Sequence, residues 1–253
     1  MSWKPFALTL GLLVAVELAV RVFGVPAYLV PPPTEVAVEL VERWDYFAAN
    51  IPATLWETWA GFLIALVVGV ALAVPIALTR FGDQAIMPIL VATQSVPKTA
   101  LAPIFVIWFG FGFTPKIVVA ALLAFFPIVV NTVRGLRSVD PEIVQYLRTL
   151  GAHPWDILRR LRFPTSLPYL FAGMKVSISL AIVGAIVGEF IGADEGLGHV
   201  ILRAINNFDT GTMFAALLVV SVIGVLSYGV IALIEKRVLS WQPDDVSAAA
   251  GGA

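Results

Sequence analysis

The sequence predicts an all-α polytopic membrane protein with six transmembrane helices and one basic cytoplasmic hairpin. Hydrophobic residues make up 59% of the 253 residues and charged residues only 13%, and the mean hydropathy is +0.93. A water-soluble domain cannot cover that much apolar surface, so the chain belongs in a lipid bilayer. Long apolar runs alternate with short polar segments, and this alternation gives the six spans.

Residues 1–24 are expected to form the first transmembrane helix. An apolar run follows Lys4, a pattern that also fits a cleaved signal peptide. Glu17 and Arg21 interrupt the run one helical turn apart, where they can pair, and no clear small-residue cleavage site follows. A retained helix is therefore the preferred interpretation.

Residues 25–53 are expected to form an amphipathic segment on the external surface. Consecutive prolines stop the preceding helix, and Thr34 can cap a new one. Acidic side chains then alternate with an apolar stripe at helical spacing. The stripe consists of Val36, Leu40, Val41, Trp44 and Phe47.

Residues 54–237 are expected to form a five-helix core. Its first span, 54–78, carries a small residue every fourth position, which lets a neighbouring helix approach closely. These residues are Gly61, Ala65, Gly69 and Ala73. The next apolar region, 85–109, is interrupted by three prolines and holds Lys98 near its middle, so a straight helix is not expected there. Residues 117–133 are expected to form the fourth span.

A basic hairpin of two short helices is predicted for residues 140–164. Asp140 can cap the first helix, and Gly151 supplies a left-handed stop. Pro154 opens the second helix, which is expected to end at Pro164. A basic hairpin between membrane spans is typical of a docking surface.

The remaining spans are expected at 169–191 and 213–234, joined by a polar, acidic loop. The fifth span carries two series of small residues, typical of a helix that contacts other helices or a pathway. They are Gly173, Ser177, Ala181 and Ala185, and then Gly184, Gly188 and Gly192. Residues 238–253 are expected to form a disordered cytoplasmic tail.

The distribution of lysine and arginine predicts the orientation, because cytoplasmic loops are enriched in both. The hairpin side holds ten of them: Lys4, Arg80, Arg134, Arg137, Arg148, Arg159, Arg160, Arg162, Lys236 and Arg237. The opposite side holds three: Arg43, Lys116 and Arg203. Both termini and the hairpin are therefore expected in the cytoplasm.

Several function classes are excluded by missing motifs. The chain has no phosphate-binding loop and no common hydrolase motif, so neither ATP binding of that kind nor enzyme activity is expected. It has no cysteine, and its two histidines, His153 and His199, are far apart, so no metal site is expected. No nucleic-acid partner is expected either.

Charged residues inside membrane spans are candidates for function, because burying a charge in lipid is costly. The candidates are Glu17, Arg21, Glu57, Lys98, Lys175 and Glu189. Lys98 and Glu189 are the two predicted to lie on a translocation pathway. The alternative for both is a structural ion pair or hydrogen bond.

The hairpin resembles the cytoplasmic "EAA" loop of the permease subunits of bacterial ABC importers. Gly151 matches the family glycine, and Leu161–Pro164 matches the closing element at the same spacing. Gln145–Leu147 departs from the acidic start of the family pattern. Two further stretches, QSVPKTALAPIFVIWFGFG (94–112) and GEFIGADEGLG (188–198), resemble permeases of the nitrate, sulfonate and taurine group. Those for thiamine-precursor pyrimidines and riboflavin are the most similar.

The resemblance implies a type I importer fold, a permease homodimer and a bacterial cytoplasmic membrane. Two cytoplasmic ATPase subunits would hold ATP and Mg²⁺ and bind the hairpins, and an external solute-binding protein would deliver the cargo. The hairpin residues that would couple to the ATPase are Gln145, Leu147, Arg148, Leu150, Gly151, Ala152, Trp155 and Arg159, with Arg160 beside them. The cargo would be a pyrimidine- or flavin-type heterocycle, or else a sulfonate, taurine or nitrate.

Two other function classes fit the composition. An ion-coupled secondary transporter would show inverted repeats and acidic residues at the membrane midplane, and neither pattern is evident. A membrane scaffold would need neither the glycine-rich fifth span nor the proline-broken third one. The importer permease is the preferred interpretation.

Overall fold

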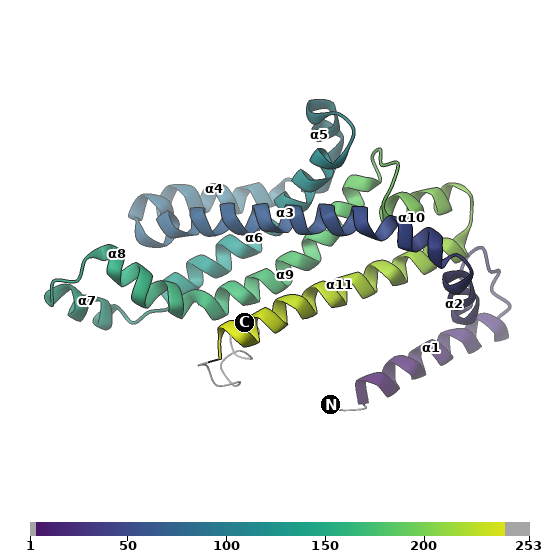
Figure 1. Ribbon diagram of the computed structural model, residues 1–253, viewed down its shortest axis with the longest axis horizontal. Coiled ribbons are helices and arrows are strands. Elements are labelled where there is room, and N and C mark those ends of the chain that lie inside the picture. The colour runs from purple at the N-terminus through teal and green to yellow at the C-terminus, as the bar shows by residue number, and fades with distance from the viewer. Residues whose placement is uncertain (1–3, 241–253) are drawn as a thin grey trace.

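The computed structural model describes residues 4–240, and within them it contains helices and no strands (Figure 1). The α-helices are α1 (Lys4–Val22), α2 (Pro33–Glu42), α3 (Trp44–Leu78), α4 (Met87–Ala92), α5 (Ala102–Phe109), α6 (Phe113–Arg137), α7 (Pro141–Thr149), α8 (Pro154–Ile157), α9 (Phe163–Glu189), α10 (Leu197–Asn206) and α11 (Thr210–Val238). Two short 3-10 segments, Thr93–Ser95 and Lys98–Leu101, and two π-helical turns, Gly82–Ile86 and Leu158–Arg162, connect some of them. The predicted all-α class is confirmed.

Helix α6 lies at the centre of the bundle, between α3 and α9. Ala120 of α6 is flanked by Gly61 on one side and Gly184 on the other. A Cβ atom added to Gly61 would lie 2.6 Å from the Ala120 Cβ, and one added to Gly184 would lie 2.6 Å from the Ala120 Cα. Only glycine permits such close backbone approach, so the predicted small-residue series are the packing surfaces.

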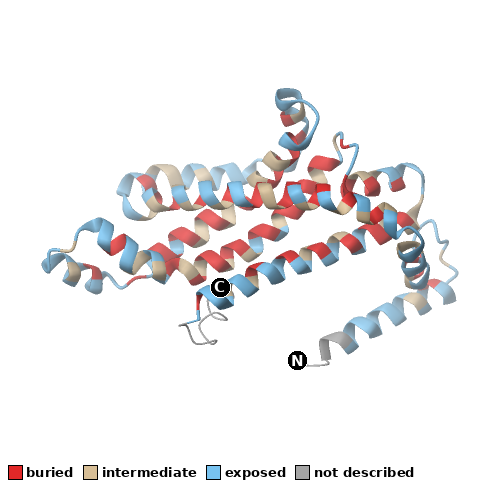
Figure 2. Cartoon of the chain, in the orientation of Figure 1, coloured by how far each residue is buried: buried red, intermediate tan, exposed pale blue. Residues whose placement is uncertain are grey.

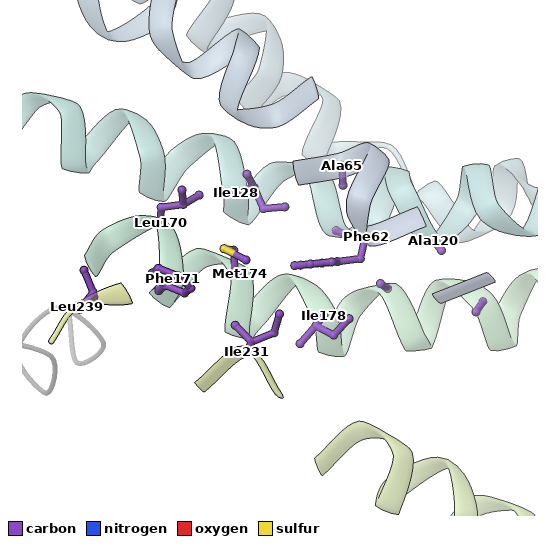
Figure 3. Packing of buried hydrophobic residues seen from close by; sticks show 13 residues of the cluster. Phe62, Ala65, Ala120, Ile128, Leu170, Phe171, Met174, Ile178, Ile231 and Leu239 are labelled. Atoms are coloured by element: carbon purple, nitrogen blue, oxygen red, sulfur yellow. The ribbon is translucent and has the colours of Figure 1, made fainter. Parts of the chain in front are cut away.

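The largest apolar cluster fills the space where these helices meet (Figure 3). Phe62 projects from α3, Ile128 from α6 and Ile178 from α9, and each is at most 1% exposed. Ile231 brings α11 into the same cluster. Buried residues accordingly concentrate on α3, α6 and α9, whereas residues 7–22 of α1 are mostly exposed (Figure 2).

Four helices within the described residues are long and apolar enough to cross a membrane: α3, α6, α11 and the continuous Pro154–Glu189 helix. The α4–α5 region is a fifth span if it is counted as one, because its two halves, Gly82–Ser95 and Lys98–Phe109, meet at 81°. The predicted break in this region is therefore confirmed. Helix α1 would be the sixth span, and the count of six stays a prediction.

The second span begins earlier than predicted. Helix α2 ends at Glu42, and α3 starts at Trp44 instead of Thr54, so part of the predicted external segment, 25–53, belongs to the span helix. Arg43 separates the two helices with a non-helical backbone (φ −110°, ψ 23°). Pro52 lies inside α3 without ending it. No glycine or proline stands between these helices to mark their boundary in the sequence, and only Arg43 leaves the helical conformation.

The second arm of the hairpin does not end at Pro164, as predicted, but continues into α9. Residues Pro154–Glu189 form one 36-residue helix. The π-helical turn at Leu158–Arg162 directly precedes the proline. Such a widened turn accommodates residues that a regular helix tolerates poorly. The hairpin and the fifth span are therefore one continuous element.

The hairpin helices α7 and α8 lie at one end of the long axis, and α2 and α10 lie at the other (Figure 1). Helix α10 was not predicted, although Leu197, Val200, Ile201 and Ala204 follow helical spacing and are buried. Residues 241–253, most of the predicted tail, lie outside the described residues.

Candidate functional site

The hairpin turn is built as predicted around Asp140 and Gly151. The Asp140 carboxylate accepts a hydrogen bond from the Glu142 N–H at 2.8 Å and caps α7. Gly151 has φ +84°. The Ala152 N–H donates to the Leu147 carbonyl and the Gly151 N–H to the Arg148 carbonyl, each at 3.0 Å. This is the Schellman pattern, which needs a left-handed residue where Gly151 stands.

Two of the predicted coupling residues hold the hairpin together from inside. Leu147 and Ala152 pack against a small core of Val139, Val144 and Ile157. An apolar contact between these two positions commonly accompanies the Schellman pattern. Both side chains are partly buried within this chain, so only part of their surface is free for a partner, and their coupling role stays a prediction.

The outer face of the hairpin carries the other predicted residues. Leu150 is 65% exposed and Trp155 62%. Gln145, Gly151, Arg148, Arg159 and Arg160 are also exposed. Ile143 and Tyr146 of α7, which were not predicted as coupling residues, are also 48% and 64% exposed. Aromatic and arginine side chains are the residue types enriched at the centres of protein interfaces.

A second candidate site is a buried charge cluster on α3, α6 and α9, near the end opposite the hairpin. Lys116 Nζ lies 2.8 Å from Glu57 Oε1, and both side chains are at most 6% exposed. Within the described residues, both carboxylate oxygens of Glu57 are buried without a hydrogen-bond partner. The same is true of Thr58 Oγ1. The contact is thus an ion pair, on which the buried Glu57 charge depends.

Glu189 joins this cluster and anchors the start of α10. The Thr54 hydroxyl donates to Glu189 Oε1 at 2.6 Å, and the Gly198 N–H donates to the other oxygen. A Cβ atom on Gly198 would lie 2.7 Å from that oxygen, so glycine is required there. A carboxylate at a helix N-terminus is also favoured by the helix dipole.

Thr54 and Asn50 of α3 complete the anchor. The Leu197 N–H donates to Thr54 Oγ1 and the Gly196 N–H to Asn50 Oδ1, both at 2.8 Å. Glu189 was predicted to lie on a pathway, and the structure places it, fully buried, in this hydrogen-bonded anchor. These are the hydrogen bonds that its structural alternative predicts, and its place on a pathway stays a prediction.

Lys98 lies elsewhere, at the break between α4 and α5. Its amine donates to the Gln94 side chain and lies 6.0 Å from the Phe126 ring centroid. Thr93, Ser95 and Thr99 lie within five residues of it in the chain and are exposed. Irregular backbone within a membrane occurs where it is buried in protein or lines an aqueous cavity. This polar break is therefore a candidate for the pathway.

The comparisons with known proteins identify the family. A model of the "Binding-protein-dependent transport system inner membrane component" family matches residues 59–240. The chain belongs to this permease family. The formylaminopyrimidine transport permease protein of Halalkalibacterium halodurans is 36% identical to the permease over 94% of this chain and 96% of the relative. The riboflavin transport system permease protein of Chloroflexus aurantiacus is 36% identical over 91% and 87%.

A more distant relative and a solved structure agree with this family. The putative aliphatic sulfonates transport permease protein of Bacillus subtilis is 27% identical over 95% of this chain and 88% of its own. A chain of the inward-facing MetNI methionine ABC transporter shares the fold, with a TM-score of 0.65 and 21% identity over 75% of the permease and 94% of that chain. The permease is therefore a membrane subunit of an ABC importer for small solutes.

Proposed function

We propose that the permease works as a homodimer that moves a planar heterocycle into the cytoplasm by alternating access. Both termini and the hairpin face the cytoplasm, where ATPase subunits hold ATP and Mg²⁺, and this chain contributes no nucleotide site. One observation carries the proposal: the hairpin exposes aromatic and basic side chains, and its second arm continues without a break into α9. The lysine and arginine distribution supports the orientation.

The continuous Pro154–Glu189 helix provides the mechanical link. At 1.5 Å per residue, its 36 residues span about 54 Å. One end lies in the hairpin, and the other ends at Glu189 in the buried cluster. Displacement of the hairpin by the ATPase would therefore move the anchor of α10 at the far end. This coupling would convert ATP-driven closure into opening of the external side.

The proposed cargo class rests on the relatives and on the polar break. The two relatives with 36% identity are named for a formylaminopyrimidine and for riboflavin, and both are aromatic heterocycles. At the break, the Lys98 amine, the Gln94 amide and the Phe126 ring lie together. An amine, an amide and a ring face suit a planar cargo that both stacks and accepts hydrogen bonds.

Reconstituted uptake tests the proposed function. The permease is placed in proteoliposomes with its ATPase partner and a solute-binding protein, and entry of a labelled pyrimidine or flavin is followed. We expect uptake that requires ATP and stops when the ATPase carries a disabled phosphate-binding loop. Uptake that persists with the disabled ATPase, or without it, would instead favour an ion-coupled transporter.

Replacing Lys98 by methionine tests the polar break. Methionine keeps most of the side-chain length but loses the charged donor, a hydrogen bond of which is worth about 1.5–3 kcal/mol. We expect the uptake rate at limiting cargo to fall about tenfold or more, with basal ATP hydrolysis unchanged. Lys236→Met is the matched control, since Lys236 is exposed near the end of α11. If Lys98→Met took up cargo as fast as Lys236→Met and the wild type, Lys98 would not be a pathway residue.

A further inference from the structure

The turn between α10 and α11 lies at the end of the molecule opposite the hairpin (Figure 1) and holds Phe208. Phe208 is 84% exposed. Its φ of +56° is the only positive value on a non-glycine residue within residues 4–240. A bulky residue in this region of backbone space is uncommon and strained. The exposed ring and the strained backbone occur at the same residue.

The backbone around Phe208 forms a regular helix stop that favours glycine. The Asp209 N–H donates to the Ala204 carbonyl at 2.9 Å, and the Phe208 N–H donates to the Ile205 carbonyl at 3.1 Å. In this Schellman pattern Phe208 occupies the left-handed position, where glycine has no steric penalty. Burial of the ring cannot offset the strain, because the ring is exposed. The side chain is therefore explained best by a contact outside this chain.

The two arginines beside this turn differ in their partners. Arg43 forms ion pairs with Glu39 at 2.9 Å and Asp209 at 3.1 Å, and it donates to the Thr212 hydroxyl at 2.8 Å. Burial alone would raise the pKa of Asp209, but the Thr212 hydrogen bonds and the Arg43 charge outweigh it and hold the pKa below its usual value. Asp209 thus stays ionised and keeps Arg43 engaged.

Arg203 is the cation available to a partner. It is exposed on α10, and within residues 4–240 its guanidinium has no hydrogen bond or ion pair. A polar hollow of about 460 Å³ lies beside it. Its lining residues include Arg43, Tyr46, Asn207, Asp209 and Thr212. The hollow adjoins Phe208, whose two chain neighbours both line it.

We propose that Phe208 and Arg203 form the docking surface for the solute-binding protein that delivers cargo to this permease. The binding protein would receive the Phe208 ring in an apolar recess and present an acidic side chain to Arg203. Aromatic and arginine side chains are the types that dominate binding energy at interfaces. The family is binding-protein-dependent by description, and the α10–α11 turn lies at the end of the molecule opposite the hairpin. The inference rests on the proposed function and its orientation.

Phe208→Gly separates docking from folding, because it should weaken binding of the solute-binding protein without lowering the stability of the permease. Glycine relieves the left-handed strain, so the Tm of the purified permease–ATPase complex should rise or stay unchanged. The Kd for the solute-binding protein that stimulates ATP hydrolysis by the wild-type complex should increase about tenfold or more, the loss typical of a central aromatic anchor. Arg203→Glu should weaken binding similarly, whereas Asn206→Ala on the same exposed turn should not.

A lower Tm for Phe208→Gly would show that the ring stabilises this chain and would overturn the inference. An unchanged Kd for both Phe208→Gly and Arg203→Glu would also overturn it, while wild-type stimulation would leave the proposed function standing. If no solute-binding protein stimulates the wild-type complex, the proposed function fails and the docking surface fails with it.

A single thiol distinguishes the binding protein from lipid. The chain has no cysteine, so Phe208→Cys can be labelled uniquely with an environment-sensitive fluorophore. We expect its emission to shift when the binding protein is added to labelled complex in lipid nanodiscs. A shift between detergent and nanodiscs, with none on addition of the binding protein, would identify Phe208 as a membrane anchor and overturn the proposal.

Discussion

Replacing Lys116 by methionine is expected to destabilise the permease by about 3–5 kcal/mol, the cost of breaking a buried ion pair from one side. Lys116 is the cation 2.8 Å from Glu57, and Glu57 is fully buried. Glu189 lies in the same cluster, so the substitution leaves two carboxyl groups without their countercharge. We expect a clear decrease in Tm for the solubilised variant, followed by intrinsic fluorescence on heating.

A second substitution shows whether the loss comes from the unpaired charge. The double variant Lys116→Met with Glu57→Leu removes both members of the pair and should recover most of the lost Tm. Lys175→Met is the matched control, because Lys175 also lies 2.8 Å from a glutamate, Glu235, but the two side chains are 19% and 13% exposed. Its decrease in Tm should be smaller. A Lys116→Met variant as stable as the wild type would show that the cluster contributes no stability.

The helical fold and its close contacts follow from local patterns in the sequence. Apolar length predicts the spans, and the small residues of α3 and α9 predict where helices touch. Gly61 and Gly184 meet Ala120 from opposite sides, as these patterns require. The Asp140 cap and the Gly151 turn are equally local, because each depends on a few neighbouring residues. Such features need no knowledge of the rest of the chain.

The buried charge cluster could be predicted only in part. Glu57 and Glu189 stand out as charges within apolar runs, but nothing in their spacing shows that they share a site. Lys116 was counted with the external loop residues, because it stands only just before an apolar run. In the structure it lies inside α6 at 4% exposure. Tertiary packing brings the three residues together, and no local pattern records it.

The continuous helix through Pro164 was missed for a different reason. Proline usually ends a helix, so local chemistry predicts two separate elements there. The structure places a π-helical turn before the proline and continues the helix into α9. Packing of α9 against α6 along the glycine series offsets the local cost. Under the proposed mechanism this continuity would matter, because a flexible joint at Pro164 would not transmit force.

Gly151→Val is expected to abolish coupling between ATP hydrolysis and transport. Gly151 has φ +84°, and a β-branched residue there is a strong backbone outlier. A Cβ atom meets nothing within 4 Å in this chain, so the penalty comes from the backbone and not from a clash. The strained turn would displace Leu150 and Trp155, the exposed apolar residues on either side. We expect uptake to fall about a hundredfold, the combined effect of turn strain and lost interface anchors.

The substitution Gly151→Asn provides the matched control, because asparagine adopts the left-handed conformation readily. It should retain most of the uptake, although it also adds a side chain. Both variants should keep the wild-type Tm, since the hairpin core of Val139, Val144 and Ile157 is separate from the main core. Basal ATP hydrolysis is measured in the same proteoliposomes, so that loss of coupling is told apart from loss of the ATPase. Normal uptake by Gly151→Val would mean that the hairpin is not the coupling element. Equal loss in both variants would instead mean that partner contact at this position, and not the backbone turn, limits coupling.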